Sequence, residues 1–307
     1  NETNEGFPRG MNRGIRASTA PYVCLLNNDL QFTKGWLEEM LHIASSNPQA
    51  GVVNPASNNF GNRPGRGVSL EAHAAQLRSR HGQFTEVGMC IGFCMLIKRQ
   101  VIDRIGRLTE EVERIFFEDE DYSMRVQQAG YVCVVAEGSY VYHAEHQTVR
   151  HGPERDALFQ RNQQWCNQRW GRRLRIAWPV FDKAAPGSPE LRRRLEQFLK
   201  WARRRTYVYV YCAMPDGARR DDVFGSVGIV PHVDVVWRRI PRAFAPWVAG
   251  AYILKRRKKP FDLIVSPDAR WGTFMSRLKW LHGAEVVPEG DEAELTERWK
   301  AKSHSLS

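Results

Sequence analysis

The chain has 307 residues, 42% of them hydrophobic and 26% charged, which is enough for one large globular domain and a smaller one. Its longest uncharged apolar stretch, residues 243–254, is shorter than the roughly 20 residues that a membrane-spanning helix needs. The formal net charge of +11 arises mainly after residue 180, where 24 Lys and Arg accompany 15 Asp and Glu. Six cysteines without a Cys-x-x-Cys pair, and no signal-peptide pattern, favour reduced, buried thiols in a cytoplasmic protein.

The first predicted strand, residues 21–26, ends abruptly in Asn27-Asn28-Asp29, which disfavour its continuation. This pattern places a carboxylate at the carboxyl end of a buried strand. Apolar residues after Thr33 recur at spacings of three and four, which predicts a helix. Thr33 is a residue type that can cap its start. A strand followed by a turn and a helix favours a mostly parallel sheet that is covered by helices.

The middle of the chain combines a loop, two strands and an acidic helix start. Residues 54–66 are rich in Asn, Gly and Pro, which predicts a loop over a site. Strands are predicted at residues 89–97 and 131–136, and two phenylalanines between them lead into a helix that ends at Gly130. The first turn of that helix is entirely acidic, with Glu118, Asp119, Glu120 and Asp121.

A change in composition predicts the domain organisation. We expect a first domain over residues 1–178, a linker with an Arg-rich helix over 179–205, and a small α/β domain over 206–307. Strands of the last domain are predicted at residues 207–212, 233–237, 261–266 and 284–287. The basic runs at 192–194, 203–205 and 255–259 suit anionic lipid, a diphosphate-linked acceptor or nucleic acid, and the alternative is a solvated surface.

Three groups of residues are candidates for chemistry. Asp29 is a candidate metal ligand, although Asn-Asn-Asp is also an ordinary turn sequence. The acids at 118–121 are candidates for a general base, although the helix dipole also favours acids in a first turn. His143 follows a predicted strand at 139–142 and is either a metal ligand or a hydrogen-bonded polar residue.

The ordered set of motifs in roughly the first 150 residues resembles the family 2 glycosyltransferases. The resemblance rests on these motifs together: Asn4-x-Gly6-Phe7, Asn12-x-Gly14-Ile15, Leu25-Leu26-Asn27-Asn28-Asp29, Gly92-Phe93-Cys94-Met95-Leu96-Ile97-Lys98-Arg99, Glu118-Asp119-x-Asp121-Tyr122-x-x-Arg125, Ala129-Gly130-Tyr131 and Val141-Tyr142-His143. Their order and spacing are more specific than any one of them. The strand that normally begins this family and holds the nucleotide base would precede Asn4, so we expect the first domain to be incomplete at its N-terminus.

The resemblance implies a fold and an activity. The implied fold is α/β: a GT-A-like nucleotide-binding sandwich with a mostly parallel mixed sheet, here with a smaller C-terminal α/β unit. The implied reaction is the transfer of a sugar, of hexosyl or rhamnosyl type, from a nucleotide diphosphate sugar to an acceptor hydroxyl with inversion, in cell-envelope polysaccharide, glycan or glycolipid synthesis. The implied cofactor is a divalent metal, Mg²⁺ or Mn²⁺.

The resemblance also implies roles for particular residues. Asp29 matches the principal metal ligand, and His143 matches a position that completes the metal site in several relatives. Asp119 matches the general base, with Glu118 beside it. The implied donor-side residues are Asn12, Asn27 and Asn28, where Asn27 replaces the first carboxylate of the Asp-x-Asp motif.

The expected partners are a nucleotide diphosphate sugar and a glycan or lipid-linked acceptor. The basic second part adds an expected peripheral contact with the inner face of the membrane, and we expect no specific nucleic acid because no recognition signature is present. The alternative function is a non-catalytic sugar- or nucleotide-binding module that is derived from the same fold.

Overall fold

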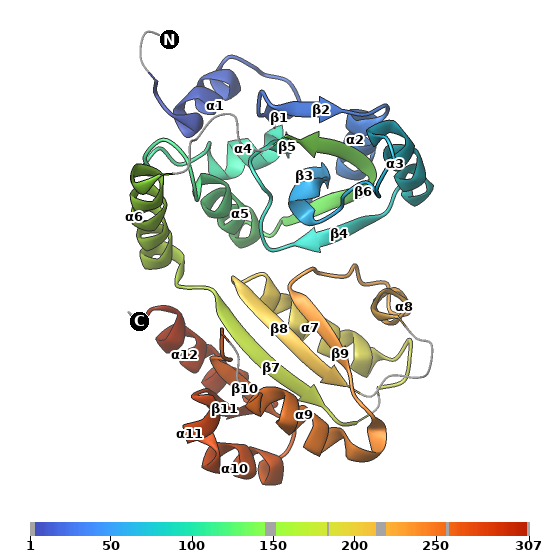
Figure 1. The fold of residues 1–307 in the computed structure, drawn as a ribbon, viewed down its shortest axis with the longest axis vertical. Helices are drawn as coiled ribbons and strands as arrows, with labels where there is room; N and C mark the ends of the chain where they lie inside the picture. Colours follow the sequence, from blue (N-terminus) through green and yellow to red (C-terminus); the bar gives the residue numbers. More distant parts are fainter. Residues whose placement is uncertain (1–3, 145–151, 183, 213–218, 256–257, 306–307) are drawn as a thin grey trace. The chain divides into compact units, whose positions relative to one another are not determined.

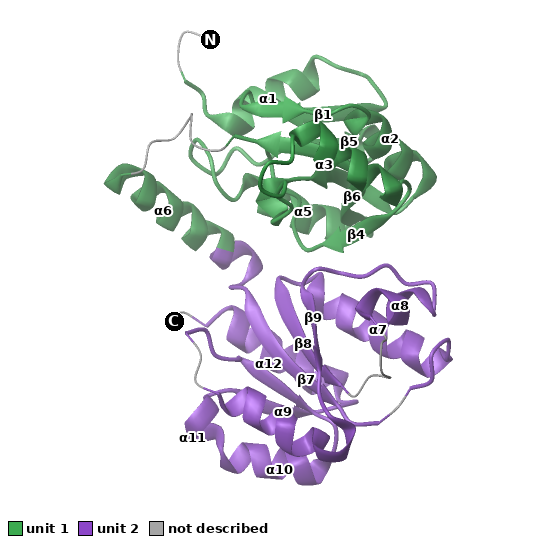
Figure 2. Cartoon of the chain, turned by 45° about the vertical axis from the view of Figure 1, so that its right-hand side comes forward, with its two compact units in different colours: residues 1–166 green, residues 167–307 purple. Residues whose placement is uncertain are grey.

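The computed structural model describes residues 4–144, 152–182, 184–212, 219–255 and 258–305. The chain separates into two compact units, residues 1–166 and residues 167–307 (Figure 2). This division lies earlier than the boundary that the sequence predicted. The reason is that β7 (Leu174–Val180) pairs with β8 and β10 of the second sheet, so the segment before residue 179 already belongs to the second unit.

The first unit begins with a helix and then builds a mixed sheet. Its elements are α1 (Phe7–Arg16), β1 (Tyr22–Leu26), β2 (Leu30–Phe32), α2 (Trp36–Ser46), β3 (Ala50–Ala56), η1 (Asn58–Phe60), α3 (Leu70–Leu77), η2 (Arg78–Arg80), β4 (Phe84–Val87), β5 (Cys94–Lys98), α4 (Arg99–Ile105), α5 (Glu118–Gln128), β6 (Val132–His143) and α6 (Pro153–Trp170), which contains the boundary between the units (Figure 1).

The strand order in the first unit is β1-β5-β3-β6-β2, with β4 also paired to β6. The predicted mixed α/β character is confirmed, but β3 and β6 form the one parallel pair among the described strands of the first unit. β5 lies between β1 and β3 and is antiparallel to both, so β1 and β3 run in the same direction. The strand-helix-strand pattern β1-α2-β3 fixes that direction, whereas nothing local in the sequence reveals that β5 inserts between the two strands.

Helices cover both faces of this sheet. Along β5, Met95 and Ile97 contribute to the core beneath α4 and α5, whereas Cys94 and Leu96 contribute to the core beneath α2. This alternation follows from the two-residue period of side chains in a strand. The sheet is therefore buried on both sides, and polar side chains at the strand ends remain available for a site.

Two local predictions in this unit need correction. Thr33 does not cap α2; the cap position is Gly35 in a left-handed conformation, and the Thr33 hydroxyl donates to the carbonyl of Tyr140 at 2.6 Å. The strand predicted at residues 89–97 begins only at Cys94, so residues 88–93 form a loop. The helix predicted after Phe117 is present as α5, and Gly130 follows it with φ +84° as predicted.

The second unit is a parallel α/β domain. Its elements are β7, α7 (Pro189–Ala202), β8 (Thr206–Cys212), α8 (Arg220–Gly225), β9 (Val235–Arg239), η3 (Arg242–Phe244), α9 (Ala245–Leu254), β10 (Leu263–Ser266), α10 (Ala269–Arg277), α11 (Lys279–His282), β11 (Glu285–Pro288) and α12 (Glu292–Ser303). The strand order is β11-β10-β7-β8-β9, and every described pair is parallel. The four strands predicted after residue 206 are confirmed.

Helices pack on both faces of the second sheet. One core joins α7 and α12 to the sheet, and the other joins α9 and α10 to it. The predicted Arg-rich helix is α7, and its apolar stripe is buried. None of the six cysteines forms a disulfide within the described residues, and five of them are buried.

Candidate active site

The carboxyl end of β1 and the end of β6 bring three predicted residues together. Asp29 follows β1, and its Oδ1 lies 3.1 Å from Nε2 of His143, the last residue of β6. The side chains of His143 and Asp29 are 14% and 11% exposed, so the pair is accessible from one side. Nδ2 of Asn27 lies 3.3 Å from the same imidazole nitrogen. β2 pairs with β6 so that Leu30 lies opposite His143. This pairing brings Asp29 next to His143, although the two residues are 114 positions apart in the sequence.

Two asparagines that the sequence analysis did not single out hold His143 in place. The Asn58 side chain accepts from the backbone N–H of His143 and donates to its carbonyl, each at 2.8 Å. Oδ1 of Asn59 lies 3.1 Å from Nδ1 of His143. An amide oxygen at that position selects the tautomer with the proton on Nδ1, which leaves the Nε2 lone pair directed at Asn27 and Asp29. Both asparagines lie in the segment predicted as a loop over a site, but their contacts depend on a pairing that is distant in sequence.

The arrangement of Asp29 and His143 fits a divalent cation. The described residues contain no group of three His, Cys, Asp or Glu side chains that could hold a metal. Magnesium commonly takes one or two protein ligands and completes its shell with substrate phosphates and water. Two adjacent ligands about 2.1 Å from an octahedral ion lie about 3 Å apart, which is close to the 3.1 Å between these two atoms. Asn28 is exposed beside the pair.

Asp119 lies at the start of α5, on the other side of the loop over residues 88–93. Its Oδ2 accepts from the backbone N–H of Gly92 at 3.0 Å, and its Oδ1 accepts from the N–H of Glu120 at 2.8 Å. Burial of the carboxyl group raises the pKa of Asp119 to about 6, and the Gly92 hydrogen bond opposes that rise. A carboxylate with a pKa near 6 is ionised at neutral pH and still accepts a proton readily.

The four acids of α5 occupy different environments. Burial raises the pKa of Glu118 to about 8, and the charge of Asp119 adds to the rise. Oε2 of Glu118 has no hydrogen-bond partner among the described residues. Asp121 is fully buried and binds the guanidinium of Arg125 at 2.8 Å. Asp119 is half-buried and lies at the loop that leads to His143, so it is the member of this cluster best placed to act on a substrate.

The loop over residues 88–93 connects the two halves of the site. The ring of Phe93 stacks on His143 with centroids 5.4 Å apart, and the carbonyl of Phe93 accepts from the backbone N–H of Asn27 at 2.8 Å. The buried side chain of Asn54 holds this loop through the N–H and carbonyl of Ile91 and the carbonyl of Cys94. The same loop therefore positions Gly92 against Asp119 and Phe93 against His143.

The backbone before α5 is strained. Arg114, Phe116 and Phe117 all have positive φ, between 56° and 81°, although none is glycine. Such conformations cost about 1 to 3 kcal/mol each and persist where surrounding contacts impose them. The amide of Asn162 in α6 donates to the carbonyls of residues 113, 115 and 116, and Phe159 contacts both phenylalanine rings. These contacts fix the angle at which α5 enters the site.

Asn12 does not lie where a donor-side residue was expected. It is 1% exposed, its amide donates to the carbonyl of Leu108 and to Glu110, and its oxygen accepts from the N–H of Leu108. Its polar atoms are thus committed to the loop before α5. The prediction of a direct donor contact at Asn12 is therefore replaced by a role in positioning that loop.

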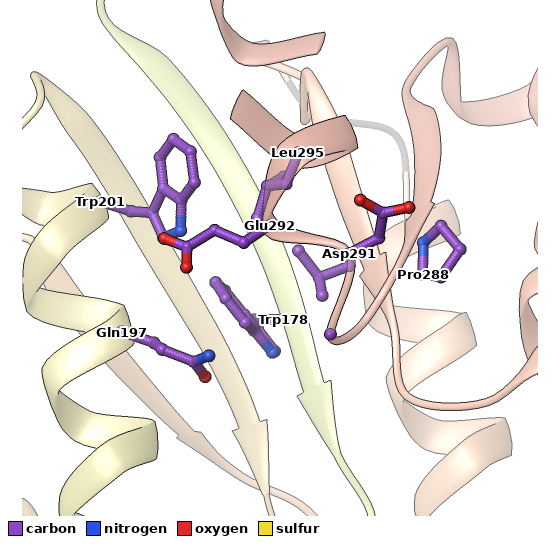
Figure 3. A pocket seen from close by; sticks show the side chains of 9 residues that line it. Trp178, Gln197, Trp201, Pro288, Asp291, Glu292 and Leu295 are labelled. Carbon is purple, nitrogen blue, oxygen red and sulfur yellow. The ribbon is translucent and has the colours of Figure 1, made fainter. Parts of the chain in front are cut away.

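A separate hollow lies in the second unit (Figure 3). Its volume is about 20 Å³, and it lies between α7 and α12. The lining residues are Trp178, Gln197, Trp201, Val265, Pro288, Gly290, Asp291, Glu292 and Leu295. None of the site residues predicted from the sequence lies in this hollow.

The comparison with protein families decides what the first unit resembles. Residues 1–106 match the model of glycosyl transferase family 2. The resemblance to this family that the motifs predicted is confirmed over that segment. The match contains Asn27, Asp29 and the Gly92-Phe93 loop, whereas Asp119 and His143 lie beyond it.

One relative matches part of this chain. An uncharacterized protein, y4gI of Sinorhizobium fredii (strain NBRC 101917 / NGR234), is 27% identical over 176 residues, which is 52% of this chain and 19% of that protein. The chain thus spans about a fifth of the length of this relative.

Two solved structures are similar at a low level, each with a TM-score of 0.37. One is GalNAc-T7 with UDP, GalNAc and Mn²⁺, at 15% identity, with 47% of this chain and 31% of that chain covered. The other is the mannosyltransferase PcManGT from Pyrobaculum calidifontis with GDP-Man and Mn²⁺, at 14% identity, with 97% of this chain and 63% of that chain covered.

Proposed function

We propose that the first unit transfers a sugar from a nucleotide diphosphate sugar to an acceptor hydroxyl, with inversion at the anomeric carbon. The observation that carries this proposal is the single loop that joins Asp119 to the pair formed by Asp29 and His143. One side of the loop offers ligands for a cation and diphosphate, and the other side offers a base. The family match over residues 1–106 supports the same reaction class.

In the proposed reaction, Asp119 accepts the proton of the acceptor hydroxyl. The hydroxyl oxygen then forms a bond to the anomeric carbon, while the bond from that carbon to the diphosphate oxygen breaks and the nucleoside diphosphate leaves. A raised pKa suits Asp119 to this role because the carboxylate must hold the proton that it receives. Glu118, with its pKa near 8, is mostly uncharged at neutral pH, so it adds little repulsion beside the ionised Asp119.

Asp29 and His143 would hold the divalent metal, Mg²⁺ or Mn²⁺. The metal would neutralise charge on the departing diphosphate. Asn59 keeps the Nε2 lone pair of His143 available, and Phe93 supports the imidazole face. Asn27 and the exposed Asn28 are the proposed donor-side residues of the same strand end.

The finer assignments rest on the family resemblance alone. They are the transfer of a hexosyl or rhamnosyl group, an acceptor that is a glycan or a lipid-linked glycan, and a cytoplasmic role in cell-envelope polysaccharide synthesis. A peripheral membrane contact is a separate proposal that rests on the charge of the second unit.

The test is nucleotide release and sugar transfer by the full-length protein and its Asp119→Asn variant. General-base help is typically worth about 10² to 10⁴ in rate, so kcat should fall by that factor while donor binding stays the same. Asp103→Asn removes an exposed acid elsewhere in the unit and should leave kcat unchanged. Equal kcat for wild type and Asp119→Asn would remove Asp119 from the base role. Donor binding without turnover in the wild type would instead indicate the non-catalytic binding module.

A further inference from the structure

Large hydrophobic side chains are exposed on four helical elements of the second unit. We call this set the aromatic face; its members are Phe244, Trp247, Tyr252, Phe274, Trp280 and Leu281. They come from η3, α9, α10 and α11. Trp247 and Trp280 are 72% and 78% exposed, which is unusual for the largest apolar side chains.

The helices that carry the aromatic face are joined by a ring contact and by packing. The rings of Trp247 and Phe274 are 6.2 Å apart, which joins α9 to α10. Helix α11 packs against both of these helices, and the two ribbon views show the three helices side by side (Figures 1 and 2). The exposed side chains are therefore carried by helical elements that pack together in one part of the unit.

Helix α9 carries apolar residues on opposite sides. Ala245, Ala249 and Ile253 face the core, whereas Trp247 and Tyr252 are exposed. A helix that is apolar all round is usually covered on all sides. The outer side of α9 therefore has the character of a surface that meets an apolar environment.

The elements that carry the aromatic face, and the segment after α9, also carry cations. The exposed ones are Arg242, Lys255, Lys258, Lys259, Arg270, Arg277 and Lys279. Within the described residues none of these cations lies within ion-pair distance of a carboxylate. The acids of residues 240–283 are Asp262, which binds Arg172 at 2.6 Å, and Asp268, which caps α10 through the N–H of Trp271. Residues 240–283 therefore combine an excess of positive charge with exposed apolar side chains.

We propose that the aromatic face docks the protein onto the surface of a membrane that contains anionic lipid. Tryptophan and tyrosine concentrate where a bilayer meets water, and lysine and arginine beside them attract anionic headgroups. Charge complementarity favours this occupant over another domain or a second copy of the same positive face. A nucleic acid would match the charge, but it would leave the aliphatic Leu281 and much of the apolar area without a partner.

The geometry allows docking in the interface and not passage through the bilayer. Helix α9 has 10 residues and is about 15 Å long, whereas the hydrocarbon core is about 30 Å thick. Within the part of the chain that the structure describes, no helix has both the length and the apolar character needed to span a membrane.

The structure also changes which arginines make the expected membrane contact. In the run at 192–194, Arg192 binds Glu196 at 3.0 Å and Arg194 binds Asp182 at 2.8 Å, so these charges are partly neutralised. The proposed docking surface lies instead on η3, α9, α10 and α11. It does not depend on the proposed transfer reaction, because none of the candidate catalytic residues lies in this unit.

The test is flotation of the full chain with vesicles of phosphatidylcholine alone and with 30 mol% phosphatidylserine added. We expect the wild type to float with the phosphatidylserine vesicles and much less with the neutral ones. Trp247→Ser/Trp280→Ser should lower the partition coefficient at least tenfold, because two large apolar side chains are lost. Lys258→Gln/Lys259→Gln should lower it by roughly fivefold for each lost charge at low ionic strength.

The matched control is Arg104→Gln/Arg107→Gln, which removes two exposed charges from the first unit and should float like the wild type. Circular dichroism checks that each variant folds, which is expected because the replaced side chains are exposed. The proposal is overturned if the wild type does not float, or if Trp247→Ser/Trp280→Ser floats equally well. It is also overturned if vesicles fail while an RNA oligonucleotide binds, or if gel filtration shows a wild-type dimer that the double tryptophan variant loses.

Discussion

The imidazole of His143 stacks on the ring of Phe93 at 5.4 Å, with only 12° between the two planes. The residue before Phe93 is Gly92, whose N–H donates to Asp119. A single dipeptide thus supports the proposed metal ligand on one side and the proposed base on the other. A change in the 88–93 loop would disturb both functions together, so variants that separate the functions must replace residues outside this loop.

Asn59 provides such a variant. Its Oδ1 accepts from Nδ1 of His143, so Asn59→Leu removes the acceptor while Asn59→Asp keeps one. Loss of a hydrogen bond that orients a metal-binding histidine typically lowers metal affinity about 10- to 100-fold. Calorimetry with Mn²⁺ and nucleoside diphosphate should show that loss for Asn59→Leu and a much smaller one for Asn59→Asp. Equal affinities for both variants would mean that Asn59 does not set the tautomer.

Local sequence patterns predicted the ends of the active-site elements well. The acid after β1, the acidic start of α5 and the end of β6 all lie where the sequence placed them, because apolar period and turn residues mark these positions locally. The contacts between them were not predictable in the same way. Asn58 and Asn59 reach His143 across 85 and 84 positions, and the Asn-Gly-Pro-rich pattern indicated only a loop there.

The role of Asn12 and the position of β5 escaped the sequence analysis for a related reason. Asn12 binds residues about 96 positions away, so its neighbours in the sequence reveal no burial. The apolar run at 89–97 resembles one strand, yet its first part is a loop because Asn54 binds the backbone at Ile91 and Cys94. Tertiary hydrogen bonds thus override the local strand preference at the place where the loop serves the site.

The raised pKa of Glu118 predicts a pH-dependent stability. Its pKa is about 8 in the folded protein and near 4.5 when unfolded, so the folded state holds the proton more tightly between these values. The unfolded state then binds fewer protons, and the free energy of unfolding falls as pH rises toward 8. Between pH 6 and 8, above the pKa of Asp119, the loss should be about 2 to 3 kcal/mol.

Glu118→Gln removes this titration. Between pH 6 and 8, the free energy of urea unfolding should change less for this variant than for the wild type. At pH 9, the free energy of unfolding of the variant should be larger than that of the wild type. Parallel pH profiles for the two proteins would show that Glu118 does not titrate in this window.

Gly6 lies against the loop before α5, and a side chain at this position should lower the free energy of unfolding. A Cβ at Gly6 would lie 2.6 Å from the Cα of Arg114, and Gly6 also has φ +81°. Gly6→Ala should therefore destabilise the first unit by about 2 kcal/mol or more, since both a backbone clash and a left-handed alanine are introduced. Gly10, within α1, has nothing within 4 Å of its added Cβ, so Gly10→Ala should stabilise by about 0.5 to 1 kcal/mol. Thermal unfolding of both variants checks the difference, and a similar shift for both would contradict the packing of Gly6 on the loop.

The most direct test of the proposed active site is calorimetry of nucleoside diphosphate binding with Mn²⁺ present and absent. The full-length protein should be compared with Asp29→Asn, His143→Gln and Asp119→Asn, using UDP and GDP as ligands. The proposed roles predict that the first two variants lose the Mn²⁺-dependent part of the affinity, by at least tenfold, and that Asp119→Asn keeps it. Wild-type affinity in Asp29→Asn and His143→Gln, or an equal loss in Asp119→Asn, would contradict the division of the site into a metal side and a base side.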